Sequence, residues 1–199
     1  MNYPKGIKQV NNNSYIKYDN RGMGLESDIN LTNQYYVDKG IAYIYKKPTP
    51  IQVTKVDYKN SGMVIKEAFF KEPSTTDYNG LYNGMYIDFE AKETNNAAAF
   101  PLANIHMHQI EHIRHVIDNG GIGFVIVRFT KLNKTYILFG KDLVAFVDKK
   151  ERKSIPISYF DTNGHIVKDG FIPRLDYLSV IKEVLGGCAD GKKEKIDKK

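Results

Sequence analysis

The spacing of hydrophobic residues changes several times along the chain, and each change indicates an expected element. Leu25, Ile29, Thr32 and Tyr36 recur on one face of a helical repeat, and Gly40 follows as a stop signal. Residues 122–129 form a nearly continuous apolar run, which is typical of a strand buried on both faces. The other predicted elements are strands over 41–47 and 135–140, and helices over 101–119, 141–152 and 174–185.

Two alternating runs predict a β-hairpin. They cover Ile51–Tyr58 and Met63–Phe70 and are joined by the turn sequence KNSG. Both faces of this hairpin carry polar residues, so we expect an insertion that projects from the sheet. Together the elements predict an α/β fold in which a mixed sheet is flanked by helices.

The strand expected over residues 85–92 has one apolar and one polar face. Because side chains alternate along a strand, its apolar face carries Ile87, Phe89 and Ala91. The polar face carries Tyr86, Asp88, Glu90 and Lys92. Two Asn-Gly dipeptides precede this strand. A hairpin through one of them would return Asp77, which we place at the turn, to Glu90.

This arrangement suggests a metal site. Magnesium prefers hard oxygen ligands and keeps several waters, so Asp77 and Glu90, helped by the Ala91 carbonyl, suffice to hold it. Lys92 would then orient a water or stabilise charge at phosphorus. An acid followed by Glu-x-Lys is typical of metal-dependent nucleases. In the alternative reading, Asp77 satisfies its own turn, and Glu90 and Lys92 are solvated neighbours.

Composition narrows the class of protein. The 199 residues are 42% hydrophobic and 12% aromatic, which predicts one domain with a substantial core. A net charge of +6 favours a polyanionic partner, nucleic acid before membrane. No apolar run is long enough for a membrane span, and the first residues lack a signal-peptide core, so we expect a cytoplasmic protein. Cys188 has no partner for an internal disulfide.

The chain divides into three expected parts. Residues 1–20 are polar and form a flexible basic arm, residues 21–187 form the nuclease domain, and residues 188–199 form a disordered Lys-rich tail.

Longer motifs resemble one family. The stretches KKPTPIQV, PSTTDYNGLYNGMYIDFEAKET and PRLDYL are similar to the RecU family, Holliday junction resolvases of Gram-positive bacteria. The likeness runs from about Arg21 to Leu178 and is densest over residues 74–112. It implies a restriction endonuclease-like core, a homodimer, and a need for Mg2+ or Mn2+. It also implies cutting of four-way DNA junctions in recombination and repair.

The resemblance assigns roles to individual residues. The family's metal ligands match Thr75, Asp77, Glu90 and Gln109. Its catalytic lysine, a transition-state stabiliser, matches Lys92. Gln109 carries no such signal by itself, because it reads as a polar position on a helix. The expected catalytic set is therefore Asp77, Glu90 and Lys92.

DNA contacts are expected from basic residues outside that set. Arg21 matches a basic N-terminal position of the family, and Ile51–Phe70 matches the family's projecting stalk. The family usually has Pro-Lys-Arg near the stalk tip, whereas this chain has YKNSG, which leaves Lys59 as the cation there. Lys46 and Lys47 are expected to contact phosphate, with plain solvated charge as the alternative.

Other interpretations stay open. The histidines at 106, 108, 112 and 115 crowd one expected helix at a spacing compatible with zinc. A rival function is a recombination mediator that binds and anneals DNA without cutting it, and another is a sequence-specific duplex endonuclease. A recombinase and a branch-migration helicase are the expected protein partners.

Overall fold

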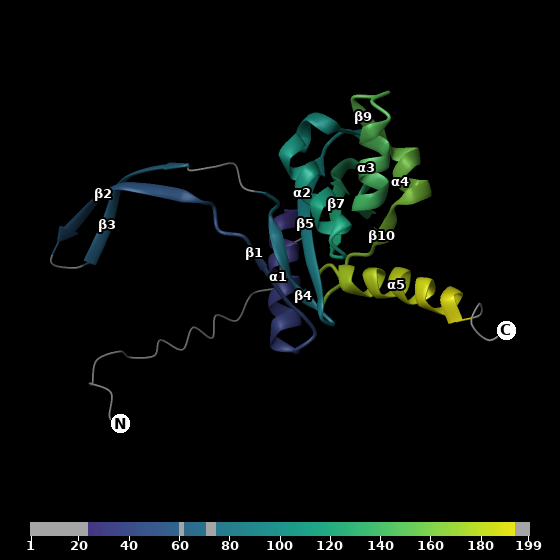
Figure 1. The fold of residues 1–199 in the computed structure, drawn as a ribbon, viewed down its shortest axis with the longest axis horizontal. Coiled ribbons are helices and arrows are strands. Elements are labelled where there is room, and N and C mark those ends of the chain that lie inside the picture. Colours follow the sequence, from purple (N-terminus) through teal and green to yellow (C-terminus); the bar gives the residue numbers. More distant parts are fainter. Residues whose placement is uncertain (1–23, 60–61, 71–74, 194–199) are drawn as a thin grey trace.

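A six-stranded mixed sheet forms the centre of the protein in the computed structural model, which describes residues 24–59, 62–70 and 75–193 (Figure 1). The strands lie in the order β1-β4-β5-β7-β8-β10. Their bounds are β1 Tyr43–Lys46, β4 Tyr78–Tyr82, β5 Met85–Thr94, β7 Ile122–Phe129, β8 Lys134–Phe139 and β10 His165–Val167. Strands β5 and β7 are parallel, and the other neighbours are antiparallel. The predicted mixed sheet is confirmed.

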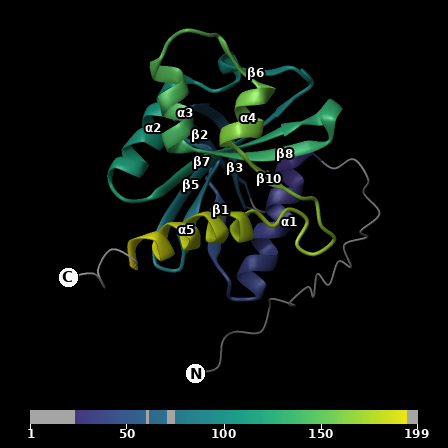
Figure 2. The same cartoon turned by 90° about the vertical axis from the view of Figure 1, so that its right-hand side faces the viewer.

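Helices cover both faces of this sheet (Figure 2). Helices α1 (Leu25–Asp38) and α5 (Tyr177–Lys193) pack on one face. Helices α2 (Met107–Asp118), α3 (Gly140–Asp148) and α4 (Ile157–Asn163) pack on the other. Strand β7 serves both cores, because Phe124 and Ile126 point to the first and Val125 and Val127 to the second. None of the helices described is both long and apolar enough to cross a membrane.

The predicted hairpin projects from the body as a separate two-stranded sheet, which we call the stalk (Figure 1). It consists of β2 (Ile51–Lys59) and β3 (Gly62–Phe70) in antiparallel pairing. Residues 64–69 are all exposed, in keeping with an element that lies outside the core. The hairpin character expected for this segment is confirmed.

The predicted start of the second helix is wrong. The helix expected from residue 101 begins at Met107, because Ala99–Pro101 forms strand β6 against β9 (Ser154–Pro156) and Leu102–Asn104 forms a short 3-10 helix, η1. The partner strand lies far along the chain, so no local pattern announces it. A second 3-10 helix, η2, covers Thr130–Leu132.

The expected terminal segments are only partly testable. Helix α5 continues past Cys188 to Lys193, into the segment for which disorder was the expectation. Residues 1–23 and 194–199 lie outside the described residues, so the basic arm and the end of the tail stay predictions.

The packing of β4 against β1 depends on one glycine. A Cβ at Gly80 would lie 2.1 Å from the Tyr43 carbonyl oxygen and 2.6 Å from the Ile44 Cα. Gly80→Ala is therefore expected to lower the free energy of unfolding by about 1–3 kcal/mol, since the two strands must separate. Denaturant unfolding measures this. The matched control is Gly186→Ala in α5, where an added Cβ meets nothing within 4 Å and helix propensity predicts a gain of up to about 1 kcal/mol. An unchanged Gly80→Ala protein would contradict the close approach.

Candidate active site

The β4–β5 hairpin brings Asp77 to Glu90. Its turn is at Asn83 and Gly84, whose φ angles of 49° and 77° are those of a tight hairpin turn. Tyr78 pairs with Phe89, so Asp77, one residue earlier, lies across from Glu90. Asp77 thus precedes β4 and does not lie at the turn, which corrects the sequence interpretation. Its Oδ2 accepts a hydrogen bond of 3.1 Å from the Ala91 N–H.

Glu90 is a fully buried carboxylate. Its neighbours Ile87 and Phe89 point to the core beneath α1 and α5, as predicted, while Glu90 points to the opposite face. The Lys92 Nζ lies 2.5 Å from Glu90 Oε1. Within the part of the chain that the structure describes, neither Glu90 oxygen accepts a hydrogen bond of acceptable geometry. The reading of Glu90 as a solvated surface charge is therefore wrong.

Burial has an electrostatic consequence for Glu90. Loss of solvation raises the pKa of its carboxyl group, Lys92 lowers it and the nearby Asp77 carboxylate raises it, and the net pKa is about 7. A carboxylate that is buried, short of donors and next to a second carboxylate is well suited to a cation, because a cation offsets both desolvation and repulsion. These two acids fit a magnesium ion that keeps several waters.

The other two expected metal ligands, Thr75 and Gln109, each accept a hydrogen bond from the protein. Thr75 is exposed, and its Oγ1 accepts a 3.0 Å hydrogen bond from the Lys47 Nζ. Gln109 is buried near the start of α2, where its Oε1 accepts a 3.0 Å bond from the His106 N–H. Gln109 therefore caps the helix, and this capping role is a contact that sequence reasoning missed.

A second buried carboxylate, Asp88, lies on the same face of β5 as Glu90. Its Oδ2 is 2.7 Å from the Lys47 Nζ and 3.1 Å from the Nε2 of His112 on α2. Sequence reasoning placed Asp88 on the polar face but gave it no role. The signal that could have found it is its position two residues before Glu90.

The structure describes only some of the residues that we expect to contact DNA. Lys46 is about half exposed and lies 2.5 Å from Glu26, whereas only 14% of the Lys47 side chain is exposed. Lys59 is the last residue of β2. Arg21 lies outside the described residues, so its role stays a prediction.

The histidine cluster does not form a zinc site. Over residues 24–59, 62–70 and 75–193, no group of three or more His, Cys, Asp or Glu side chains is placed to hold a metal ion. His106 and His108 stack with ring centroids 5.4 Å apart, and His112 turns to Asp88. Asp77 and Glu90 contribute only two such groups, so hydroxyl, carbonyl, amide or water oxygens would complete a magnesium shell there.

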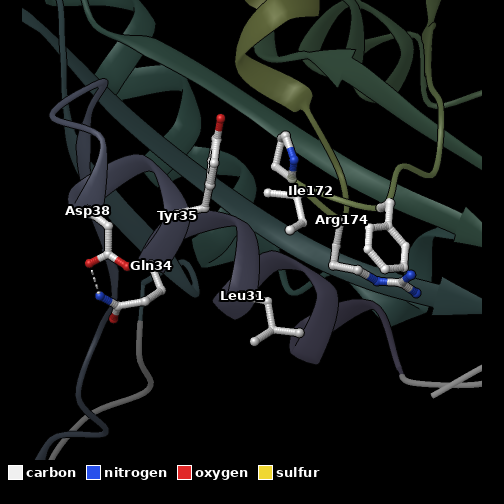
Figure 3. A pocket seen from close by; sticks show the side chains of 8 residues that line it. Leu31, Gln34, Tyr35, Asp38, Ile172 and Arg174 are labelled. Carbon is white, nitrogen blue, oxygen red and sulfur yellow. Dashed lines mark hydrogen bonds between the residues drawn. The ribbon is translucent and has the colours of Figure 1, made fainter. Parts of the chain in front are cut away.

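Among the depressions that border α1, two differ in their relation to the expected site. One of about 210 Å³ is lined by Asp77 and Lys92 together with the first residues of α1. The Glu93 Oε1 accepts a 2.8 Å bond from the Leu25 N–H, which holds the start of α1 beside this depression. The other, of about 130 Å³, lies between α1 and residues 171–174 and contains none of the expected catalytic residues (Figure 3).

The fold and the site together define the class: a mixed α/β protein with two acids and a lysine at the β4–β5 hairpin, an arrangement suited to metal-assisted phosphodiester chemistry. The family model for RecU, described as Recombination protein U, matches residues 20–183. The chain belongs to this family, which confirms the resemblance seen in its motifs.

Individual relatives agree with that assignment. The Holliday junction resolvase RecU of Geobacillus kaustophilus is 55% identical over 171 residues, covering 84% of this chain and 86% of the relative. The protein of the same name from Bacillus cytotoxicus is 52% identical with the same coverage. Among solved structures, the Holliday junction resolvase Hjc of Archaeoglobus fulgidus matches with 12% identity and a TM-score of 0.36, covering 64% of this chain and 87% of that one. A likeness this low carries no argument.

The raised pKa of Glu90 predicts a pH dependence of stability. Its pKa is about 7 in the folded protein against 4.5 ordinarily. Between these pH values the metal-free folded protein therefore keeps Glu90 protonated, whereas the unfolded chain does not. Stability is then lost as the pH rises from about 4.5 to 7. Glu90→Gln removes this loss and is expected to stabilise the metal-free protein at pH 8 by up to about 3 kcal/mol.

Thermal or denaturant unfolding at pH 5 and pH 8 with a chelator present measures the effect. Glu111→Gln, a change at a partly exposed residue of α2, is the control. Parallel pH profiles for Glu90→Gln and the parent would contradict the assignment.

Proposed function

We propose that this protein is a magnesium-dependent endonuclease that resolves Holliday junctions as a homodimer. Its core would be of the restriction endonuclease type. The observation that carries the proposal is the fully buried Glu90 carboxylate, which lies next to Asp77 and Lys92 without an adequate set of donors. Membership of the RecU family and relatives named Holliday junction resolvase support the substrate.

Each residue of the proposed site has its own role in metal binding or in charge stabilisation. Asp77 and Glu90 would hold the divalent ion, with Thr75 and Gln109 as further oxygen donors, directly or through water. When bound, the ion supplies an activated water and stabilises charge on the phosphate. Lys92 pairs with Glu90 in the metal-free protein and lies 27% exposed at the depression beside Asp77. In the reaction, its ammonium would stabilise the developing negative charge at phosphorus.

DNA would be positioned by basic residues outside the metal site. Lys46 lies at the end of β1 just before the stalk, and Arg21 and Lys59 complete the expected contacts. Two subunits related by a two-fold axis would place two sites on opposite strands, which matches the symmetry of a four-way junction. Contacts with a recombinase and a branch-migration helicase belong to the same proposal.

Removing either carboxylate is the direct test. Asp77→Asn and Glu90→Gln are expected to slow single-turnover cutting of a four-way junction by at least about 10²-fold, because each removes an oxygen ligand while leaving the side-chain volume unchanged. Junction affinity, measured by mobility shift at one salt concentration, should change little.

Asp118→Asn, at an exposed position at the end of α2, controls for a general loss of negative charge. Cutting at the parental rate by either site variant would remove Asp77 and Glu90 from the chemistry and overturn the proposal.

The stalk is expected to confer preference for junctions. It forms a two-stranded sheet of its own, separate from the six-stranded sheet, and bears the exposed Lys55 and Lys66. Replacing Val56–Val64 by a short Gly-Ser turn should leave Mn2+ binding intact and reduce the ratio of junction to duplex affinity by at least about tenfold. Binding is compared at one stated salt concentration, since phosphate contacts depend on salt.

The charge-only variant Lys55→Gln/Lys66→Gln, which keeps the hairpin, separates shape from charge. A shortened protein that folds and prefers junctions as strongly as its parent would show that selectivity resides elsewhere.

A further inference from the structure

The polar face of β5 carries two buried carboxylates, Asp88 and Glu90, and only Asp88 is surrounded by hydrogen-bond donors. Asp88 is completely buried, and its Oδ2 is surrounded by three polar groups: Lys47 Nζ at 2.7 Å, the Tyr86 hydroxyl at 2.8 Å and His112 Nε2 at 3.1 Å. Its Oδ1 accepts the hydroxyl proton of Thr76. These donors come from the end of β1, from β5 itself, from α2 and from the segment that precedes β4.

All three N–H donors of Lys47 have partners in this cluster. They point to Asp88 Oδ2, to Thr76 Oγ1 at 2.7 Å and to Thr75 Oγ1 at 3.0 Å. His112 Nε2 is a fourth neighbour at 3.5 Å. An ammonium with three good acceptors in the protein has no donor left for a DNA phosphate. The adjacent Lys46 is the exposed one and points to Glu26.

The cluster lies where the stalk joins the sheet. The chain leaves β1 through Lys47, forms the stalk, and returns through Thr75 to Asp77. The Lys47 N–H also donates a 2.8 Å bond to the Asp77 carbonyl oxygen. Lys47 therefore holds the returning segment twice: by its backbone at Asp77 and by its ammonium at Thr75.

The position of the returning segment decides whether the metal site forms. Thr75 and Asp77 are two of the proposed oxygen donors, and Asp77 must stay across from Glu90 for both carboxylates to reach one ion. The Thr75 hydroxyl accepts from Lys47 with one lone pair, so its second lone pair remains for another partner.

We propose that Lys47 and Asp88 are positioning residues of the cleavage site: their largely buried ion pair fixes the segment from Thr75 to Asp77 against β5. This inference rests on the proposed function. It replaces the expectation that Lys47 contacts phosphate, and it gives the two adjacent lysines different tasks. Lys46 faces DNA, and Lys47 orders the metal ligands.

The test compares variants of the adjacent Lys46 and Lys47 by two measurements. Mn2+ affinity is measured on the DNA-free protein by calorimetry, and junction affinity by mobility shift over a range of salt. Lys47→Gln and Asp88→Asn are expected to weaken Mn2+ binding about tenfold and to slow single-turnover cutting about tenfold or more, with junction affinity and its salt slope unchanged. Lys46→Gln is expected to show the reverse: parental Mn2+ affinity, weaker junction binding and a smaller salt slope.

Two controls separate positioning from loss of stability and from failure of the underlying proposal. Leu143→Ala removes core volume beneath α3, away from the site, and should lower the melting temperature while Mn2+ affinity stays parental well below it. Glu90→Gln should abolish Mn2+ binding if the proposed function holds.

The outcomes are distinct. If Glu90→Gln still binds Mn2+ and the protein still cuts DNA, the proposed function itself fails. If Glu90→Gln loses both activities but Lys47→Gln and Asp88→Asn keep Mn2+ affinity, only the positioning role is overturned. A reduced salt slope for Lys47→Gln with parental Mn2+ affinity would return Lys47 to the phosphate contacts. Because Asp88→Asn keeps the shape and one acceptor oxygen, it serves if Lys47→Gln fails to fold.

Discussion

The structure of the site depends on the burial of two carboxylates, Asp88 and Glu90, on one face of β5. A buried charge is costly unless donors or a counter-ion surround it. Asp88 has an ammonium, two hydroxyls and an imidazole around it, whereas Glu90 has one lysine and faces Asp77. On the same face of the strand, the charge of Asp88 is thus already offset by protein groups, whereas Glu90 can still bind a cation.

This difference links the stalk to the chemistry. The hairpin leaves the sheet at one end of β1 and returns to the start of β4, and these two strands are neighbours. Lys47, which precedes the stalk, bonds to Thr75 and Thr76, which follow it, and pairs with Asp88 on β5. The base of the stalk and the expected metal ligands are therefore both held to β5 by the contacts of Lys47. Such a shared contact can fix the position of the stalk relative to the phosphate that reacts.

Elements with a strong local period were predictable. Helix α1 and the two stalk strands follow from spacing, because a repeat of 3.6 or 2 residues is set by backbone geometry. Strand β7 follows from its nearly continuous apolar run. The start of α2 was not, since residues 99–101 pair with residues 154–156. The short elements α4, β9 and β10 were missed for the same reason: each is held by contacts with distant segments and has too few residues to show a period.

The sequence by itself determined that Asp88, Glu90 and Lys92 share a face of one strand and that an Asn-Gly turn returns Asp77 to it, because alternation and turn chemistry act over a few residues. Only the tertiary structure decided which carboxylate is neutralised. Lys47 lies 41 positions before Asp88 and His112 lies 24 after it, so neither contact leaves a local pattern. Lys46 and Lys47 are adjacent residues of the same type, yet 45% of the Lys46 side chain is exposed against 14% of the Lys47 side chain. The reason is physical: the free energy of a charged side chain is set by the groups that surround it in the folded protein, and those come from β1, β5 and α2 together.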